Sequence, residues 1–532
     1  MYDQGVSPAA EVAKADTSEG MSKDARRTLV ASTLGVSLVI GTTVALNSAL
    51  ADIAVQTSAT QSQLTWIVDS YTVVLAGAVL PAGALGDRFG RRGALILGLA
   101  IFMAASLAPV AISSPEQLIV ARAIAGLGAA LVMPATLSLI TTAFPPEKRA
   151  RAIGIWSGVG GSSSIVVLLG SGVLLEYWGW QSIFWALSAI GLVTFVVSCT
   201  ISTSRDPNST PIDVPGSILI CASVALLVLG VVEAPLKGWT DPFVYSTIAA
   251  GLAGGALFGV LELRRRYPLL DVRLFRNATF TSAVIAVTAL SFSTFGLFYL
   301  IVQYIQMVLG YSPLLAGLAL GPQIFPIAVL GVISPLMVPR FGLRLLLGTG
   351  LALQAVGFAT LMTLEMDSTY LESVWPQLII AVGLGLTMTP ATAAIMASVS
   401  DDKQGVASAV NDSTREIGAA LGIAVAGSLL AARYAGAVTP KLAEFPEQVR
   451  EPAASSLAAA MHIAPQIGPL GEQLEVLAKS GFMEAMNASA IGMCVILAVA
   501  AVIVALCGPG RDGRVLIRIG RKQDQARSSD TG

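Results

Sequence analysis

The stretch Gly83-Ala84-Leu85-Gly86-Asp87-Arg88-Phe89-Gly90-Arg91-Arg92 connects two apolar segments, each about 20 residues long. Small residues such as Gly83 and Gly86 let helices approach closely within a membrane. A carboxylate among arginines, as at Asp87, can form charge-assisted hydrogen bonds. The stretch therefore predicts a latch where two membrane helices meet. The alternative is that the arginines only set topology, but topology requires neither the aspartate nor the glycines.

The composition of the whole chain also indicates a membrane protein. Its 532 residues are 54% hydrophobic and only 12% charged, which is too few charges to cover several soluble domains. The formal net charge of -1 gives no basic excess that would suggest nucleic acid as a partner. The four cysteines lie in or beside apolar runs without CxxC spacing, so we expect buried free thiols: Cys199, Cys221, Cys494 and Cys507.

Apolar stretches long enough to span a bilayer recur fourteen times along the chain, which predicts an all-α integral membrane protein. They lie near 29–50, 64–86, 93–112, 117–143, 151–175, 181–202, 214–234, 242–262, 279–303, 313–338, 342–364, 374–398, 405–432 and 484–507. Ala49-Leu50-Ala51 superficially resembles a signal-peptidase site. The run before it is longer than a signal sequence and a second span follows at once, so we expect it to be the first helix.

Basic residues are concentrated in alternate loops, and Lys and Arg in short loops stay on the cytoplasmic side of a membrane. The basic set includes Arg88, Arg91, Arg92, Lys148, Arg149, Arg151, Arg205, Arg264, Arg265, Arg266, Arg273, Arg276, Arg340, Arg344 and Lys403. The intervening loops carry mainly acids. With an even number of spans, this pattern predicts a multi-pass protein of the plasma (bacterial inner) membrane with both termini in the cytoplasm. Glu233, near the exterior end of the seventh span, is expected to be interfacial.

Two pairs of similar short segments, which we call echoes, indicate an internal repeat. The segment 87–92 returns as Pro339-Arg340-Phe341-Gly342-Leu343-Arg344, and the glycines and Pro-Ala-Thr of 126–136 return in 383–392. Both echoes are offset by eight helices, so we predict two pseudo-symmetric six-helix bundles with two helices inserted between them. The predicted divisions are 1–28 (tail), 29–202 (first bundle), 203–278 (helices seven and eight with linkers), 279–507 (second bundle, including an exterior loop at 434–483) and 508–532 (tail).

The stretch 83–92 resembles the G-x-L-x-D-R-x-G-R-[KR] signature of the major facilitator superfamily. The resemblance implies a cytoplasmic gate formed by Gly83, Asp87, Arg88, Gly90, Arg91 and Arg92. The segment 118–130, with Arg122 inside a span, resembles the L-x-x-x-R-x-x-Q-G-x-G-A-A signature of proton-coupled members, with Ala125 replacing the glutamine. A buried arginine is costly in a membrane, so Arg122 should face a cavity and a partner. The alternative is that it reaches toward the exterior surface near Glu116.

Trp66-Ile67-Val68-Asp69-Ser70-Tyr71 and the segment 405–422, which contains Asn411, Arg415 and Gly418, resemble the fourteen-helix drug:proton antiporter branch of that superfamily. The resemblance covers about residues 29–507. Asp69 is the leading candidate for a carboxyl that binds protons or cations, with Arg122 as its companion in proton coupling; the alternative is a solvated acid at a helix end. The candidate substrate cavity comprises Asn47, Trp66, Tyr71, Pro134 and Asn411.

Two features of that branch are missing. Thr42 stands where its first helix carries an acid, and Val167-Leu168 stands where its fifth helix carries Gly-Pro. The first change removes one site for cations or protons, and the second removes a bend that is thought to seal antiporters against leak.

The predicted function is export of amphiphilic small molecules such as drugs, antibiotics and dyes, by proton antiport with alternating access. The alternative is export of an endogenous lipid or metabolite. No P-loop GxxxxGK[ST] occurs, so the proton gradient is the expected energy source and no cofactor is expected. An enzyme is not expected, because no nucleophile motif or metal site is apparent; the only histidine, His462, is expected to be a solvated loop residue. The expected partners are substrate, protons and the bilayer, and the expected assembly is a monomer.

Overall fold

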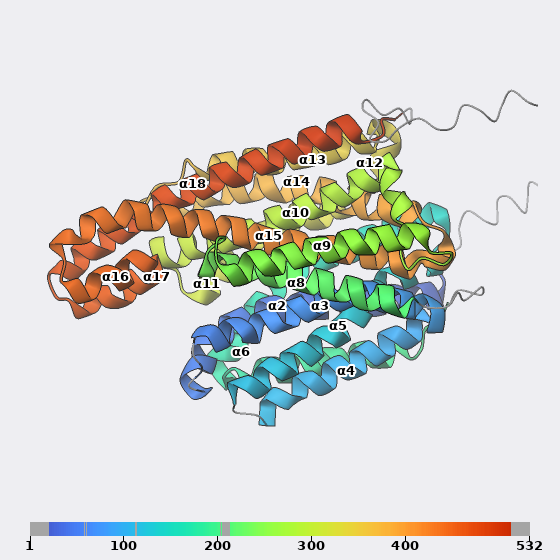
Figure 1. The fold of residues 1–532 in the computed structure, drawn as a ribbon, viewed down its shortest axis with the longest axis horizontal. Helices are drawn as coiled ribbons and strands as arrows, with labels where there is room; N and C mark the ends of the chain where they lie inside the picture. Colours follow the sequence, from blue (N-terminus) through green and yellow to red (C-terminus); the bar gives the residue numbers. More distant parts are fainter. Residues whose placement is uncertain are drawn as a thin grey trace, which may run out of the picture.

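The computed structural model describes residues 21–57, 59, 61–111, 114–202, 204 and 213–511. These residues form a long helical bundle in which no β-strand occurs (Figure 1). Within them, fourteen segments are long and apolar enough to cross a membrane. The all-α, fourteen-span prediction is therefore confirmed.

The first six spans are single helices. Their bounds are α2 (Lys23–Thr57), α3 (Gln61–Phe89), α4 (Arg91–Ala111), α5 (Pro115–Ala143), α6 (Pro146–Trp178) and α7 (Gln181–Ser198). Several helices here and later in the chain begin at a side-chain cap followed by proline. Ser114 accepts the N–H of Gln117 just before Pro115, and Asp241 accepts the N–H of Phe243 around Pro242. Such caps satisfy N–H groups that the helix itself leaves unpaired, and proline at the first position loses no bond.

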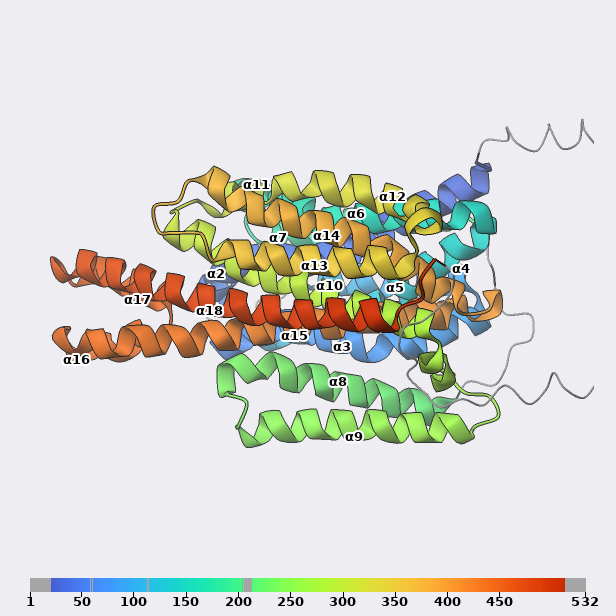
Figure 2. The ribbon, with the colours of Figure 1, turned by 90° about the horizontal axis from the view of Figure 1, so that it is seen from above.

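The inserted pair is α8 (Val214–Lys237) and α9 (Pro242–Arg264), followed by the short helix η1 (Val272–Arg276). Helix α8 packs against both α3 and α15, while α9 packs mainly against α8. Figure 2 shows the pair lying along one side of the main bundle. Much of α9 is exposed and apolar, for example Leu252 and Leu257, as expected for a helix that faces lipid.

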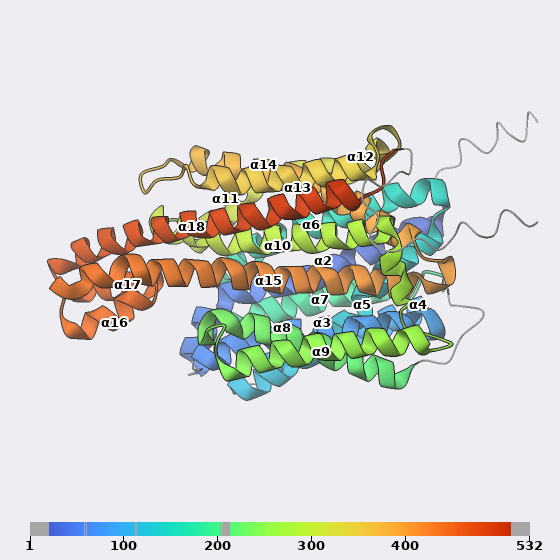
Figure 3. The same ribbon diagram turned by 45° about the horizontal axis from the view of Figure 1, so that its top comes forward.

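Among the last six spans, two consist of more than one helical segment. Their helices are α10 (Ala278–Gln303) continued by η2 (Tyr304–Val308), α11 (Pro313–Ala319) continued through η3 (Gly321–Gln323) into α12 (Ile324–Phe341), α13 (Leu343–Leu361), α14 (Tyr370–Ala397), the turn η4 (Asp401–Lys403), α15 (Gln404–Val438) and α18 (Leu470–Cys507). Helices α10, α15 and α18 pack side by side (Figure 3).

The two bundles share two local features. The turn between α3 and α4 contains Gly90 with φ 113°, and the corresponding turn between α12 and α13 contains Gly342 with φ 81°. Only glycine adopts such angles readily. Close approaches recur as well: α4 and α5 meet at Gly98 and Gly128, and α13 and α14 meet at Gly350 and Gly383. Both features agree with the predicted repeat.

The turns α3–α4 and α12–α13 and the start of α15 lie at the same end of the molecule as the start of α2 and the end of α18 (Figure 1). We call this the basic end, because the arginine-rich turns are there. The opposite end carries a projection that we call the extension, residues 434–483. Even numbers of spans place both ends of the described chain on one side, in agreement with the alternation of basic loops.

The extension differs from the predicted exterior loop, because it is mostly helical. Helix α15 runs on to Val438, η5 (Thr439–Glu444), α16 (Glu447–Ser455), α17 (Leu457–Ile463) and η6 (Ala464–Gln466) follow, and α18 begins at Leu470. A buried apolar row holds these helices together: Tyr434, Val438, Leu442, Phe445, Val449, Leu457, Leu474 and Ala478. Polar residues of the extension cover the outside of this small core, and His462 is exposed there. All four cysteines are free thiols, but the prediction that all are buried is wrong: Cys507 is buried, Cys221 and Cys494 are half-buried, and Cys199 is exposed.

Candidate functional site

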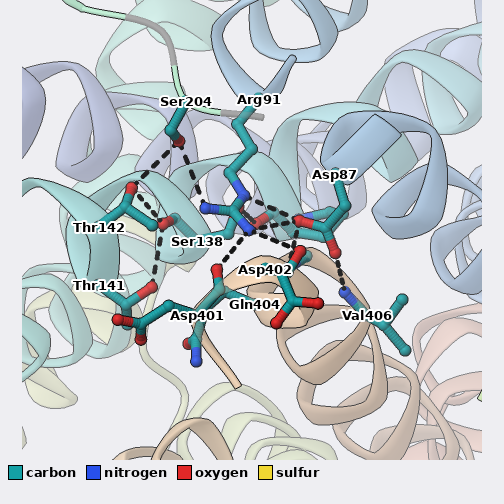
Figure 4. A network of polar contacts seen from close by, with 12 residues as sticks. Asp87, Arg91, Ser138, Thr141, Thr142, Ser204, Asp401, Asp402, Gln404 and Val406 are labelled. Carbon is teal, nitrogen blue, oxygen red and sulfur yellow. Dashed lines mark hydrogen bonds and ion pairs between the residues drawn. The ribbon is translucent and has the colours of Figure 1, made fainter. Parts of the chain in front are cut away.

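Asp87 lies at the contact between the two bundles at the basic end. Its carboxylate accepts the backbone N–H of Gly405 at 2.9 Å and that of Val406 at 3.1 Å, at the start of α15 (Figure 4). The free N–H groups and the dipole of a helix N-terminus favour an anion at this position. Gly83 packs against Gly405 so closely that a β-carbon at either glycine would strike the carbonyl oxygen of the other. Asp87 is 6% exposed, so water competes little for its hydrogen bonds.

Arg91 completes this contact, which we call the latch and define as Asp87, Arg91, Gly405 and Val406. The Arg91 guanidinium lies 2.7 Å from Asp87 Oδ1 and is 2% exposed. It also donates to the carbonyl oxygens of Asp401 at 3.0 Å and Asp402 at 3.2 Å (Figure 4). The latch therefore joins α3 and α4 of the first bundle to the α14–α15 connection of the second with buried, charge-assisted bonds.

The remaining predicted gate residues lie beside the latch rather than in it. Arg92 donates to the carbonyl oxygen of Ile201, and the Arg88 guanidinium lies 5.4 Å from the centre of the Phe89 ring. A second link between the bundles, which the sequence did not predict, is the ion pair of Arg149 with Asp401 at 2.8 Å. Its partners are 26% and 66% exposed, so it contributes less than the buried latch.

Arg122 is buried, but its partner is an aromatic ring rather than an acid. Its Nε donates to the carbonyl oxygen of Ile67 at 3.1 Å, and its guanidinium lies 4.3 Å from the centre of the Tyr71 ring. The Tyr71 hydroxyl in turn donates to the carbonyl oxygen of Val39. Arg122 Nη2 has no hydrogen-bond partner among the residues described. The alternative, in which Arg122 reaches toward the exterior surface near Glu116, is wrong. Glu116 accepts a hydrogen bond from Gln63 instead.

Asp69 is half-buried on α3 and forms no ion pair with Arg122. No hydrogen bond or ion pair to its carboxylate occurs within the described part of the chain, but it lies within electrostatic range of Glu233 on α8. Glu233 was expected at the interface; it is instead 5% exposed and paired with Lys237 at 3.1 Å. The structure thus brings Asp69 to the inserted helix pair.

Two acids inside α15, Asp412 and Glu416, were not among the predicted site residues. Asp412 is 1% exposed; its Oδ1 accepts from Asn411 and its Oδ2 has no partner among the described residues. Glu416, one turn further, is half-buried and lies within electrostatic range of both Asp412 and Arg415. It also lies within electrostatic range of Tyr71, on which Arg122 stacks. Two carboxylates four residues apart within a predicted membrane span were a signal that could have identified them from the sequence.

The other cavity candidates are placed as follows. Asn411 is buried and accepts from Thr392, Trp66 is half-buried, and Pro134 is buried within α5. The side chain of Asn47 lies outside the described residues. Thr42, which replaces the expected acid, donates within its own helix to the carbonyl oxygen of Leu38.

The segment that lacks Gly-Pro belongs to one continuous helix, α6, which has no internal proline. Within the described residues, no group of three or more His, Cys, Asp or Glu side chains is arranged to hold a metal ion.

The helices that carry these residues are neighbours. Helices α3, α5, α8 and α15 pack together, and they carry Asp69 and Asp87, Arg122, Glu233, and Asp412 with Glu416, respectively. A carboxylate removed from water tends to take up a proton unless a cation compensates its charge. Carboxylates at several depths of these helices are therefore chemically able to take up protons.

Comparison with known proteins gives matches over most of the chain. The profile of the Major Facilitator Superfamily matches residues 32–423. The multidrug resistance protein Stp of Mycobacterium tuberculosis is 32% identical over 424 residues, 79% of each chain. The tetracenomycin C resistance and export protein of Streptomyces glaucescens is 33% identical over 454 residues, 83% of each chain. The methyl viologen resistance protein SmvA of Salmonella typhimurium is 31% identical over 482 residues, 88% of this chain and 96% of that protein.

Solved structures share the fold at lower identity. A bacterial homologue of the human lysosomal transporter Spinster, in an inward-facing and unoccupied conformation, has a TM-score of 0.57 and 19% identity, and the match covers 92% of this chain and 98% of that one. The proton:xylose symporter XylE has a TM-score of 0.56 and 16% identity, with 93% and 98% covered. At these identities the similarity concerns the fold alone.

Proposed function

This chain belongs to the major facilitator superfamily, and from that premise we propose that it exports amphiphilic small molecules in exchange for protons. The names of its relatives, which include multidrug resistance and antibiotic export proteins, support the class of substrate. The relatives match over about four fifths of the chain or more, so the proposal concerns the whole transporter rather than one part of it.

The observation that carries proton coupling is the group Asp412, Arg415 and Glu416 inside α15. When all three are ionised, the two carboxylates and one guanidinium give this group a net charge of −1. Holding an unbalanced charge away from water is costly, so the group favours uptake of one further positive charge. A proton meets that need, and its release when the surroundings open to water can be linked to substrate movement.

Alternating access supplies the linkage. The latch and the Arg149–Asp401 pair fasten the bundles at the basic end, which we place in the cytoplasm. With this end closed, substrate leaves toward the extension side and protons enter from that side to reach Asp69 and then Glu416 and Asp412. Breaking the latch would open the site to the cytoplasm, where protons leave and a new substrate binds. Arg122 with Tyr71 lies beside this path and is proposed to influence which acid holds the proton.

The proposal is tested in everted membrane vesicles with a fluorescent amphiphile such as ethidium. An imposed acid-inside pH gradient should drive ethidium accumulation that stops when the gradient is collapsed. Asp69→Asn should reduce the gradient-driven rate several-fold, because the variant cannot exchange a proton at that position. Accumulation that ignores both the gradient and the Asp69→Asn change would contradict proton antiport.

A further inference from the structure

The basic end of the inserted pair holds two buried acids that the proposed cycle does not use. Asp213 is the residue before α8 and Glu262 lies in the last turn of α9; they are 6% and 3% exposed. Glycines bring the two helices close together, since a β-carbon at Gly251 or Gly254 would strike Ser223. Figure 2 shows the start of α8 and the end of α9 side by side at the basic end. The packing of the inserted pair therefore places two carboxyl groups next to each other.

Each acid uses one carboxyl oxygen and leaves the other without a partner. Asp213 Oδ1 accepts the N–H of Gly216 at 2.9 Å and pairs with the Arg265 guanidinium. Glu262 Oε2 accepts the N–H of Leu270 at 3.1 Å. Asp213 Oδ2 and Glu262 Oε1 are buried and have no hydrogen-bond partner among the described residues. Both of these oxygens lie over Gly216, where an added β-carbon would strike the first and lie 3.0 Å from the second. The two unpartnered oxygens therefore face the same small space.

Two carboxylate oxygens are held in a small buried space only when a positive charge lies between them. With Asp213, Glu262 and Arg265 all ionised, the group has a net charge of −1, and a buried unbalanced charge is costly. A proton fits best, because it converts one oxygen into a donor for the other and completes both missing hydrogen bonds. Glu262 is the acid that takes it up. Asp213 is stabilised as an anion by Arg265 and by the N-terminus of α8, whereas Glu262 lies at a helix C-terminus, which disfavours a negative charge.

The other charged groups near the pair lie on α9, on η1 and on the helices that pack against α8. Arg264 and Arg266 at the end of α9 are exposed. In η1, Asp271 Oδ1 accepts the N–H of Arg273, and the Arg273 guanidinium donates to the carbonyl oxygen of Leu263. The packed helices contribute three groups at this end: Asp87, held in the latch, Arg88, beside the Phe89 ring, and Lys403. Asp213 is the charged group that acts most strongly on Glu262, so the charge of Glu262 depends on this pair.

Glu262 also fixes the linker between the inserted pair and the second bundle, residues 265–277. The N–H that Glu262 accepts belongs to Leu270, whose side chain is buried together with that of Leu269. Both leucines line a small cavity with Val406, at the start of α15. Val406 belongs to the latch. The linker thus connects the acid pair to the latch through neighbouring side chains.

We propose that Asp213 and Glu262 share one proton and that this proton couples the acidity at the basic end to the latch. With the proton in place, Glu262 holds the linker against α15 and the latch stays closed. When the proton leaves, the two carboxylates repel each other, the linker loosens and the latch opens more readily. Acidity at the basic end therefore favours the closed state, and this stabilisation is lost as the pH rises. The pair carries neither substrate nor transported protons, so its role goes beyond export by proton antiport and does not depend on it.

The first test is labelling of Ala407→Cys in the purified full chain, with the four native cysteines replaced by serine and with no gradient. Ala407 is 1% exposed beside the linker, so a methanethiosulfonate reagent reaches this position only when the linker moves away. Relative to the reactivity of a model thiol, the labelling rate should rise about tenfold between about pH 5 and about pH 8, a range in which carboxyls removed from water ionise. Glu262→Gln keeps the hydrogen bond to Leu270 and resembles the protonated acid, so it should label slowly at every pH.

Asp271→Asn is the matched control, because it removes an acid from the same linker and asparagine still caps the N–H of Arg273. Its labelling should change with pH as in the wild type. The second test is infrared spectroscopy at neutral pH, in which the band of protonated carboxyl groups should be equal in the wild type and Asp271→Asn and smaller in Glu262→Gln. An undiminished band in Glu262→Gln would overturn the shared proton, and wild-type labelling that ignores pH would overturn its link to the latch. Transport that ignores an imposed pH gradient would contradict proton antiport but not this site.

Discussion

Asp87→Asn is expected to reduce gradient-driven export at least about tenfold while the protein remains folded in the membrane. The asparagine keeps the shape of the aspartate but loses its negative charge. In the wild type, that carboxylate accepts hydrogen bonds from two backbone N–H groups at the start of α15 and pairs with the Arg91 guanidinium. Arg91 is then left buried without its counter-ion, which costs the latched state about 3–5 kcal/mol. The equilibrium shifts toward the state that is open at the basic end, and the exporter no longer completes its cycle.

Asp402→Asn is the matched control for this prediction. Asp402 lies in the same cluster, but it contacts Arg91 through its backbone carbonyl oxygen, which the substitution keeps (Figure 4). Export by Asp402→Asn should remain within about twofold of wild type. Labelling of a cysteine placed near the basic end should increase in Asp87→Asn only. Wild-type export rates in Asp87→Asn would show that the latch does not control access.

Asp412→Asn is expected to abolish coupling to the pH gradient. The substitution brings the group of Asp412, Arg415 and Glu416 to zero net charge, so the energetic reason to take up a proton disappears. Asparagine is of equal size and keeps an oxygen that can accept from Asn411, so the fold should be retained. Gradient-driven accumulation of ethidium should fall to the background rate, whereas exchange of ethidium across vesicles without a gradient should continue.

The control for this prediction is Glu484→Gln on α18, which removes an exposed acid from another membrane helix. Its export should match wild type. Asp412→Glu should restore part of the coupling, since the acid is regained with only a small change of shape. Full gradient-driven export by Asp412→Asn would place proton binding elsewhere in the protein.

The number and class of the helices could be predicted because each span is a local property of about 20 residues. Asp87 and Arg91 were identified for the same reason, since they lie within one short motif. Their partner could not be predicted: the N–H groups of Gly405 and Val406 are more than 300 residues away and carry no side-chain signal. Only the packing of the two bundles brings them to Asp87.

Long-range packing also explains the remaining differences. Arg122 was expected to need a partner. Its partners are the carbonyl oxygen of Ile67 and the ring of Tyr71, one turn further along α3. Nothing in the sequence favours these groups over a carboxylate. The burial of Glu233 could not be predicted from α8 alone, because it results from packing against α3 and α15. The extension was expected to be a loop because its Pro and Glu residues interrupt the apolar pattern. Its helices instead bury one narrow row of side chains, from Tyr434 to Leu474.

Export by alternating access requires the two bundles to part at the basic end in every transport cycle. Arg149 and Asp401 face each other across that end and are accessible, so cysteines at both positions can be joined by a bis-methanethiosulfonate linker in a protein whose four native cysteines are serines. Linking is expected to stop ethidium export, and a reducing agent is expected to restore it, while either single-cysteine protein is unaffected. Continued export by the linked protein would show that the bundles need not part at the basic end.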